Sequence, residues 1–267
     1  MSTLLEAAAD AHVITKRNLI KIKRVPDLLV FTTLSPIMFV LLFAYVFGSA
    51  IDVPGVSYRE FLMAGIFTQT VAFGAGITAI GLAEDLQKGT IDRFRSLPMS
   101  RAAVLIGRTT SDLLNNVLVV AVMSACGLLV GWRIHNGPLN AIAGLALLFA
   151  FAYAMSWISA TIGLTVKSVE VAQSAGFIWM FPLTFLSNAF ISTDSLTPWL
   201  RKVADWNPIS SIVLALRDLW GNAPAGFARG EGFPARHPVL LSLVWISLIL
   251  IVFVPLSIAK YRRAASR

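Results

Sequence analysis

Six long apolar runs divide the sequence, and they limit the fold more than any other feature. The runs cover residues 28–50, 61–83, 113–132, 139–165, 171–191 and 239–258. A helix needs about 20 apolar residues to cross about 30 Å of hydrocarbon, and it satisfies its own backbone hydrogen bonds there. The sequence therefore predicts an all-α integral membrane protein with six transmembrane helices.

Composition supports this prediction. Only 13% of the residues are charged and 57% are hydrophobic, whereas soluble proteins average about 25% charged residues. The single cysteine, Cys126, lies in an apolar run, so we expect it to pack as a small hydrophobic side chain. The membrane is therefore the predicted solvent for most of the chain.

Basic residues indicate the side of the membrane on which each loop lies. With six spans, 15 of the 22 Lys and Arg residues fall in the N-terminal segment, between residues 84 and 108, at Lys167 and in the C-terminal tail. The other seven fall on the opposite side, and they are Arg59, Arg133, Arg201, Lys202, Arg217, Arg229 and Arg236. Because cytoplasmic loops carry the excess of positive charge, both termini are predicted to be cytoplasmic. Residues 239–267 then form span six and a basic tail.

Residues 1–27 are predicted to form an amphipathic helix on the inner membrane surface. On a helical wheel, Leu4, Leu5, Ala8, Ala9, Val13, Leu19 and Ile20 share one arc, and Glu6, Asp10, Arg17, Lys21 and Arg24 share another. Basic residues at this position attract anionic lipid head groups by about 1 kcal/mol each. The proline that follows, Pro26, turns the chain toward the first span.

The segment between the fifth and sixth runs, residues 192–238, is too polar to be a simple turn. Two short helices are predicted in it, one beginning at Thr197-Pro198 and the other at Asn207-Pro208 and ending at Gly221. Each has a polar cap followed by proline at the first helical position. The second helix is about 20 Å long, too short to span the membrane. The segment is predicted to be extracytoplasmic and either interfacial or re-entrant.

Sequence patterns for nucleotide, metal and hydrolytic sites are absent. No glycine is followed by lysine, so a phosphate-binding loop is missing and any ATP is expected to bind to another chain. His12, His135 and His237 lie far apart with no acid or cysteine at ligand spacing. We therefore expect no catalytic residue, metal or cofactor in this chain, which is predicted not to be an enzyme.

Charged residues within membrane spans usually mark an ion pathway, and the six runs are almost free of them. The exception is Asp112, one helical turn after Arg108. This spacing predicts a local ion pair at the membrane edge, with a proton relay as the alternative. Two prolines, Pro36 and Pro182, fall inside the first and fifth runs, where they kink helices or are ordinary transmembrane prolines.

Large apolar side chains surround the second of these prolines and form the candidate substrate path. The residues are Trp179, Met180, Phe181, Pro182 and Phe185. They suit a hydrophobic substrate, and they suit contact with lipid equally well.

The stretch EDLQKGTIDRFRSLPMSR, residues 84–101, mixes acids and bases more densely than any other part of the chain. Thr90 is predicted to cap a short helix that Pro98 would end. An aromatic anchor, Phe94, among charges of both signs suits docking into a groove on a soluble partner, with a solvated loop as the alternative. The candidate coupling residues are Glu84, Asp85, Lys88, Gly89, Thr90, Asp92, Arg93, Phe94 and Arg95.

This loop and its flanks resemble the permease subunits of type-2 ABC exporters of the daunorubicin and doxorubicin exporter type. The resemblance rests on Glu84-Asp85, Lys88-Gly89-Thr90, Arg93-Phe94-Arg95-Ser96-Leu97-Pro98, Arg101, Gly107-Arg108 and Asp112. It extends to residues 21–50 and 207–222, and it covers nearly the whole chain.

The resemblance implies a single permease domain over residues 1–267, in a bacterial cytoplasmic membrane, that exports hydrophobic or amphipathic drugs or lipids. The implied partners are two ATP-binding cassette subunits, which hold ATP and Mg, and a second copy of the permease or a related one. Residues 84–101 are the implied coupling loop. Membrane lipids are a further partner, and nucleic acid is not expected. The alternatives are an ion-coupled carrier, which needs charges within its spans, and a membrane-bound enzyme, which needs clustered polar residues.

Overall fold

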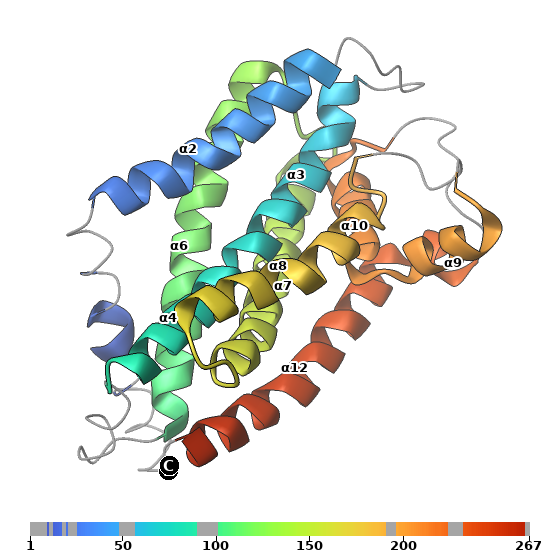
Figure 1. Ribbon diagram of the computed structural model, residues 1–267. Coiled ribbons are helices and arrows are strands. Elements are labelled where there is room, and N and C mark those ends of the chain that lie inside the picture. Colours follow the sequence, from blue (N-terminus) through green and yellow to red (C-terminus); the bar gives the residue numbers. More distant parts are fainter. Residues whose placement is uncertain are drawn as a thin grey trace.

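Every regular element is helical in the residues that the computed structural model describes, which are 10, 13–17, 20, 26–47, 57–89, 101–190, 196–223 and 232–264. Figure 1 shows these helices as an elongated bundle with shorter helices gathered at one end. The predicted all-α class is confirmed for this part of the chain.

Four helical stretches in the described ranges are long and apolar enough to cross a membrane. The first combines α3 (Tyr58–Gly74) with α4 (Gly76–Gln87), and the others are α6 (Arg101–Val130), α7 (Gly137–Gly163) and α12 (Pro238–Ala264). They correspond to the predicted spans two, three, four and six. The chain is therefore an integral membrane protein.

Shorter helices occupy the positions of spans one and five. α2 (Pro26–Leu42) contains Pro36 and continues as the π-helix η1 (Phe43–Phe47). α8 (Val169–Phe185) contains Pro182 and has 17 residues, which makes it about 26 Å long. The count of six spans stays a prediction.

Asn207 caps both the end of α8 and the start of α10 (Pro208–Trp220). The side-chain amide of Asn207 donates to the carbonyls of Leu183 and Leu186 at 2.7 and 2.6 Å. Its side-chain oxygen accepts from the amide of Ile209 at 2.8 Å. Carbonyls at the end of α8, which have no partner within the helix, are satisfied in this way.

Two helix boundaries differ from the prediction near the coupling loop. α4 continues to Gln87, so Glu84 and Asp85 lie in its last turn rather than in a loop. α6 begins at Arg101, well before the predicted start at residue 113. Just before residue 113, side-chain hydroxyl groups donate to backbone carbonyls of α6. The Thr109 hydroxyl, for example, donates to the Leu105 carbonyl at 3.0 Å. Because such polar residues fit inside a helix, hydropathy alone made both helices too short.

The two short helices predicted after the fifth run are present as α9 (Pro198–Trp206) and α10 (Pro208–Trp220), and a single turn, α11 (Phe233–Arg236), precedes α12. Gly221 ends α10 at φ +73°, a left-handed conformation that favours glycine. α10 packs against α3, α7 and α12 inside the bundle, whereas α9 lies at its edge (Figure 1).

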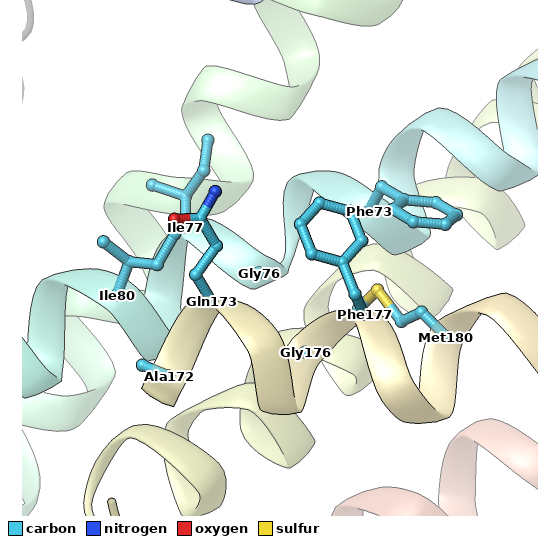
Figure 2. A pocket seen from close by; sticks show the side chains of 9 residues that line it. All are labelled: Phe73, Gly76, Ile77, Ile80, Ala172, Gln173, Gly176, Phe177 and Met180. Atoms are coloured by element: carbon cyan, nitrogen blue, oxygen red, sulfur yellow. The ribbon is translucent and has the colours of Figure 1, made fainter. Parts of the chain in front are cut away.

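A break at Ala75 separates α3 from α4 within the second span. Hydrogen bonds continue across it, because the Ala75 amide donates to the Val71 carbonyl at 3.2 Å and the Thr78 amide donates to the Ala75 carbonyl at 3.0 Å. Figure 2 shows Gly76 at the start of α4, on the side that faces α8. The break therefore lies where the second span meets α8.

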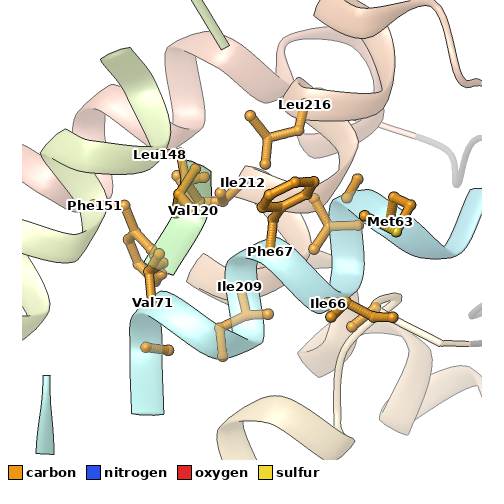
Figure 3. Close-up of a cluster of buried hydrophobic side chains, with 14 of the residues drawn as sticks. Met63, Ile66, Phe67, Val71, Val120, Leu148, Phe151, Ile209, Ile212 and Leu216 are labelled. Carbon is orange, nitrogen blue, oxygen red and sulfur yellow. The ribbon is translucent and has the colours of Figure 1, made fainter. Parts of the chain in front are cut away.

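Figure 3 shows part of the main hydrophobic core, in which side chains of α3, α6, α7 and α10 meet. The ring of Phe67 lies 5.3 Å from that of Trp132 and 5.4 Å from that of Trp220. Gly144 of α7 allows the Trp220 ring to pack against this helix, because an added Cβ would lie 2.3 Å from the indole nitrogen. α10 is thus a core element although it is too short to span.

Candidate functional site at α4 and α8

The last turn of α4 is closed by an ion pair between Glu84 and Lys88. The Glu84 carboxylate raises the pKa of the Lys88 ammonium group, because it accepts a hydrogen bond from it. Gly89 follows at φ +63°, a left-handed conformation that costs glycine little. These features end α4 at a defined point, directly before the segment predicted to bind a partner.

Residues 13–17 of the N-terminal segment pack against this end of α4. Arg17 Nη2 lies 3.7 Å from Asp85 Oδ1, and the Thr15 hydroxyl donates to the Gly107 carbonyl of α6 at 3.1 Å. Ile14 is buried, whereas Val13 is exposed. The segment therefore contacts both α4 and α6. The amphipathic helix over residues 1–27 stays a prediction, because most of those residues lie outside the described ranges.

A buried polar cluster joins α4 to α6 and is called the α4–α6 clamp here. Arg108 Nε lies 3.3 Å from Asp112 Oδ2, and Arg108 Nη2 donates to the Ile77 carbonyl at 3.2 Å. The Thr78 hydroxyl donates to the same Asp112 oxygen at 2.6 Å. Gly81 makes room for the guanidinium group, because an added Cβ would lie 2.0 Å from Arg108 Nη2. The ion pair of Arg108 and Asp112, which was predicted within one helix, thus also links α6 to α4.

The contacts of Asp112 can be compared with the two interpretations of this residue. Its Oδ2 accepts from both an arginine and a hydroxyl, and its side chain is only 7% exposed. A cation and a hydroxyl donor on one carboxylate oxygen have the geometry of a local ion pair. The predicted pair is therefore present, and the proton relay stays the alternative.

A cavity of about 110 Å³ lies between α8 and the break in the second span. Its lining comes from α3, α4 and α8 and is formed by Phe73, Gly76, Ile77, Ile80, Ala172, Gln173, Gly176, Phe177 and Met180 (Figure 2). Gly76 and Gly176 both leave open space, since an added Cβ at either would meet no atom within 4 Å. The cavity is therefore apolar, apart from one amide, and it is widened by two glycines.

A row of phenylalanine rings runs from this cavity along α8 and across to α2, and it is called the aromatic row here. Its members in order are Phe177, Phe73, Phe181, Phe185, Phe190, Phe43 and Phe39, with neighbouring ring centroids 5.0–6.3 Å apart. Three of them follow the i, i+4 spacing of one helix face. Phe181 and Phe185 are stacked at 5.5 Å and remain exposed. The row is thus an accessible aromatic surface that begins at the cavity.

Comparison with known proteins identifies the family. The model of the ABC-2 type transporter family matches residues 10–219 of the chain. The chain belongs to the ABC-2 type transporter family. This ABC-2 permease is 32% identical, over 92% of its length and 83% of the relative, to the daunorubicin resistance ABC transporter permease protein DrrB1 of Streptomyces coeruleorubidus. It is 24% identical, over 69% of its length and 62% of the relative, to the doxorubicin resistance ABC transporter permease protein DrrB of Mycobacterium tuberculosis.

The structure places the predicted substrate-path residues of the permease on different sides of α8. Met180 is buried and lines the cavity, while Phe181 and Phe185 belong to the aromatic row. Pro182 is exposed, and Trp179 packs against the hydrophobic core. The other eight residues that line the cavity were not predicted. Among them, Phe177 had a signal in the sequence, because its four-residue spacing to Phe181 and Phe185 places all three on one helix face.

The predicted coupling residues of the permease are only partly described. Glu84, Asp85, Lys88 and Gly89 lie at the end of α4. The remaining candidates, which are Thr90, Asp92, Arg93, Phe94 and Arg95, lie outside the described ranges. Their docking role therefore stays a prediction.

A buried arginine in α10 was missed by the sequence reasoning. Arg217 was counted among the outer basic residues, yet its side chain is 1% exposed inside the bundle. Its Nε donates to the Phe61 carbonyl at 3.0 Å, its Nη2 donates to the Ala189 carbonyl at 3.2 Å, and its guanidinium carbon lies 3.5 Å from the Phe61 ring centroid. Arg217 thus ties α10 to α3 and to the segment after α8.

A second set of contacts holds the same region of the permease. The Asn188 backbone amide donates to the Ser210 hydroxyl at 3.1 Å, and the Asn188 side-chain amide donates to the Ser210 carbonyl at 3.4 Å. Gly65 of α3 lies so close that an added Cβ would be 2.1 Å from the Ala189 carbonyl oxygen. The end of α8 is therefore fixed to α10 on one side and to α3 on the other.

Proposed function

We propose that this ABC-2 permease is the membrane subunit of an ATP-driven exporter for hydrophobic or amphipathic molecules, which it moves out of the cytoplasm or the inner leaflet. The observation that carries the proposal is the continuity of α4. This helix begins at the cavity, with Gly76, Ile77 and Ile80 in the lining, and ends beside the predicted coupling loop. A displacement of its last turn would change the cavity directly.

The α4–α6 clamp supports the same mechanism. Because Arg108 and Asp112 of α6 hold Ile77 and Thr78 of α4, a push on α4 is shared with α6. Residues 13–17 contact both helices at this end and would move with them. We infer that two separate ATP-binding cassette subunits, which hold ATP and Mg, deliver the push. A second copy of the permease or a related permease completes the proposed complex.

The proposed cargo is a flat, mostly apolar molecule. Stacked aromatic rings favour planar partners, because offset stacking adds about 0.5–1.5 kcal/mol per ring pair. The aromatic row runs from the cavity to Phe190, after the end of α8, and it exposes the rings of Phe177, Phe181 and Phe185. The names of two relatives refer to daunorubicin and doxorubicin resistance. We therefore propose a drug-like aromatic substrate rather than a lipid.

Replacing Phe181 and Phe185 together by leucine tests this cargo. We expect at least a tenfold loss of ATP-dependent efflux of a planar aromatic dye from vesicles that contain the permease and its ATP-binding subunit, because leucine keeps the apolar surface and removes the rings. The matched control is Leu240→Ala in α12, which is also exposed and lies outside the row. Unchanged efflux of the dye, or equal loss in the control, would contradict the proposed path. Transport driven by a proton gradient without the ATP-binding subunit would favour the ion-coupled carrier.

Replacing Arg93 and Phe94 by alanine tests the proposed docking. The expected result is at least a tenfold weaker association with the ATP-binding subunit, because the aromatic anchor and an orienting charge are both lost. Association is measured by co-purification and by titration of the labelled subunit. The control is Lys167→Ala, a basic residue outside the coupling loop. If the double variant binds and transports as well as the original permease, the docking role is wrong.

A further inference from the structure

Four side chains near α10 each bury a polar atom that has no hydrogen-bond partner in the described part of the protein. The atoms are Arg217 Nη1, Asn188 Oδ1, Thr184 Oγ1 and Gln69 Oε1. Thr184 is fully buried, and Arg217 and Asn188 are 1% and 4% exposed. Burying a polar atom without a partner is costly, so nearly all such atoms in proteins have one. These four atoms are therefore candidates to contact a ligand.

Arg217 and Asn188 belong to the same contact, between α10 and the segment after α8. Arg217 Nη2 donates to the carbonyl of Ala189, the residue directly after Asn188, at 3.2 Å. The Asn188 side-chain amide donates to the Ser210 carbonyl of α10 at 3.4 Å. Ser210 and Arg217 are two turns apart on one face of α10, and a long helical side chain leans toward the N-terminus of its helix. The guanidinium group of Arg217 therefore extends toward Asn188.

Gln69 and Thr184 approach this contact from α3 and α8. Gly65 of α3 lies against Ala189, and Gln69 follows it by one turn on the same side of the helix. The Thr184 carbonyl accepts from the Ser187 hydroxyl at 2.5 Å, and that hydroxyl accepts from the Ala189 amide at 3.2 Å. The four side chains with unpartnered atoms thus lie around Ala189, and they are called the polar site here.

The polar site lies one helical turn beyond the cavity on two helices. Met180 of α8 lines the cavity and Thr184 follows it by four residues, whereas Phe73 of α3 lines the cavity and Gln69 precedes it by four. The two helices are antiparallel, because Gly65 near the start of α3 meets the segment after α8. Figure 2 shows Phe73 and Met180 at the same end of the cavity. The polar site therefore lies directly beyond that end.

The chemistry of the four atoms selects the ligand. Two are amide oxygens, which accept hydrogen bonds, the guanidinium nitrogen only donates, and the threonine hydroxyl does both. An anion would be repelled by the amide oxygens, and a metal cation would be repelled by the guanidinium group. A hydroxyl oxygen satisfies both kinds of partner, because it accepts from the guanidinium group and donates to an amide oxygen. A buried water molecule typically makes about three such bonds.

We propose that the polar site binds a hydroxyl group, that of water or that of a cargo molecule that enters from the cavity. Binding of water needs only the permease itself. Binding of a cargo hydroxyl rests on the proposed function, and it makes the polar site a determinant of substrate specificity. The aromatic row would then contact the flat, apolar part of the same molecule.

Radiolytic labelling in water enriched in ¹⁸O tests the site in the whole chain, reconstituted in lipid nanodiscs without the ATP-binding subunit. Hydroxyl radicals that form from bound water oxidise reactive side chains beside it. Met180 is such a side chain, one turn from Thr184 and only 2% exposed. We expect at least threefold more ¹⁸O at Met180 than at Met123, which is also buried but lies on α6.

The double variant Gln69→Leu, Thr184→Val removes two of the four partners and leaves the contacts of α10 in place. We expect the ¹⁸O content of Met180 to fall at least threefold in this variant. The matched control is Thr68→Val, because Thr68 is fully buried on α3 but its hydroxyl already donates to the Ala64 carbonyl at 2.8 Å. The control variant is expected to label as the original permease does.

A pair of dyes separates the two sources of the hydroxyl group. One dye is a planar aromatic phenol and the other is its methyl ether, which cannot donate a hydrogen bond. Binding of each dye to the permease is measured by fluorescence anisotropy without ATP. If cargo supplies the hydroxyl group, the phenol binds at least fivefold tighter, and the double variant loses this preference. If water alone supplies it, the two dyes bind equally and neither lowers the labelling of Met180.

Two results would overturn the proposal. Labelling of Met180 that is no greater than that of Met123, together with equal binding of the two dyes, would mean that the polar site takes no hydroxyl group. Labelling of Met180 and a dye preference that are both unchanged in the double variant would place the hydroxyl group elsewhere. Neither measurement uses ATP, so a failure of ATP-driven export would contradict the proposed function and leave water binding at the polar site intact.

Discussion

Arg217→Lys is expected to lower the melting temperature of the purified permease by about 6–20 °C. The lysine keeps a buried charge but cannot bond the Phe61 and Ala189 carbonyls together or stack on the Phe61 ring as the planar guanidinium group does. Leaving a buried charge with poor partners costs about 3–5 kcal/mol, and 1 kcal/mol corresponds to about 2–4 °C for a chain of this size. Thermal unfolding in detergent, followed by tryptophan fluorescence, measures the change.

Two further variants identify the cause of this loss. Arg217→Met keeps most of the stem and removes the charge. The two carbonyls and the Phe61 ring lose their partner but no charge is left buried, so we expect a smaller fall than for lysine. Arg133→Lys is the matched control, because Arg133 is exposed and also donates to a backbone carbonyl, that of Leu128. If the Arg217→Lys variant melts with the original protein, or no earlier than the Arg133 control, the structural role of the buried guanidinium group is contradicted.

Arg108→Leu and Asp112→Leu are each expected to reduce the free energy of unfolding by about 3–5 kcal/mol, because either change leaves the other charge buried without its partner. The double variant is expected to lose less than the sum of the two, since it leaves neither charge behind. Unfolding of the reconstituted permease, measured for all four proteins, gives the coupling energy between the residues.

The pair Arg201 and Asp205 in α9 supplies the control for this cycle. It has the same four-residue spacing, at 3.9 Å, but both side chains are more exposed than those of the α4–α6 clamp. We expect a coupling energy below about 1 kcal/mol for this pair. Additive losses at Arg108 and Asp112, or equal coupling in the two cycles, would mean that these two residues do not act as a buried pair within the clamp.

Local signals in the sequence predicted the parts of the fold that depend on neighbouring residues. Proline after a polar cap located the starts of α9 and α10, and Gly221 located the end of α10. The spacing of Arg108 and Asp112 predicted their pairing. Each of these features is settled within one or two helical turns, where propensity and capping dominate.

Features that depend on distant residues were not predictable in the same way. A count of basic residues treats Arg217 as a surface charge, but its partners lie 156 and 28 positions away in the chain. Thr78 and Gly81 carry no motif, and their part in the α4–α6 clamp follows only from the packing of α4 on α6. The cavity likewise requires the break at Ala75 to face α8. Tertiary contacts of this kind leave no periodic pattern in the sequence.

The short length of α8 has a consequence for the surrounding bilayer. As the predicted fifth span, α8 would be shorter, at about 26 Å, than the hydrocarbon layer of a typical membrane, which is about 30 Å thick. Such hydrophobic mismatch is relieved when lipids near the helix compress, so the membrane would be thinnest beside the exposed rings of Phe181 and Phe185. An amphipathic molecule would cross a thinner hydrocarbon layer there than elsewhere around the permease. For the proposed exporter, the thickness of the host membrane is therefore expected to affect the rate of transport.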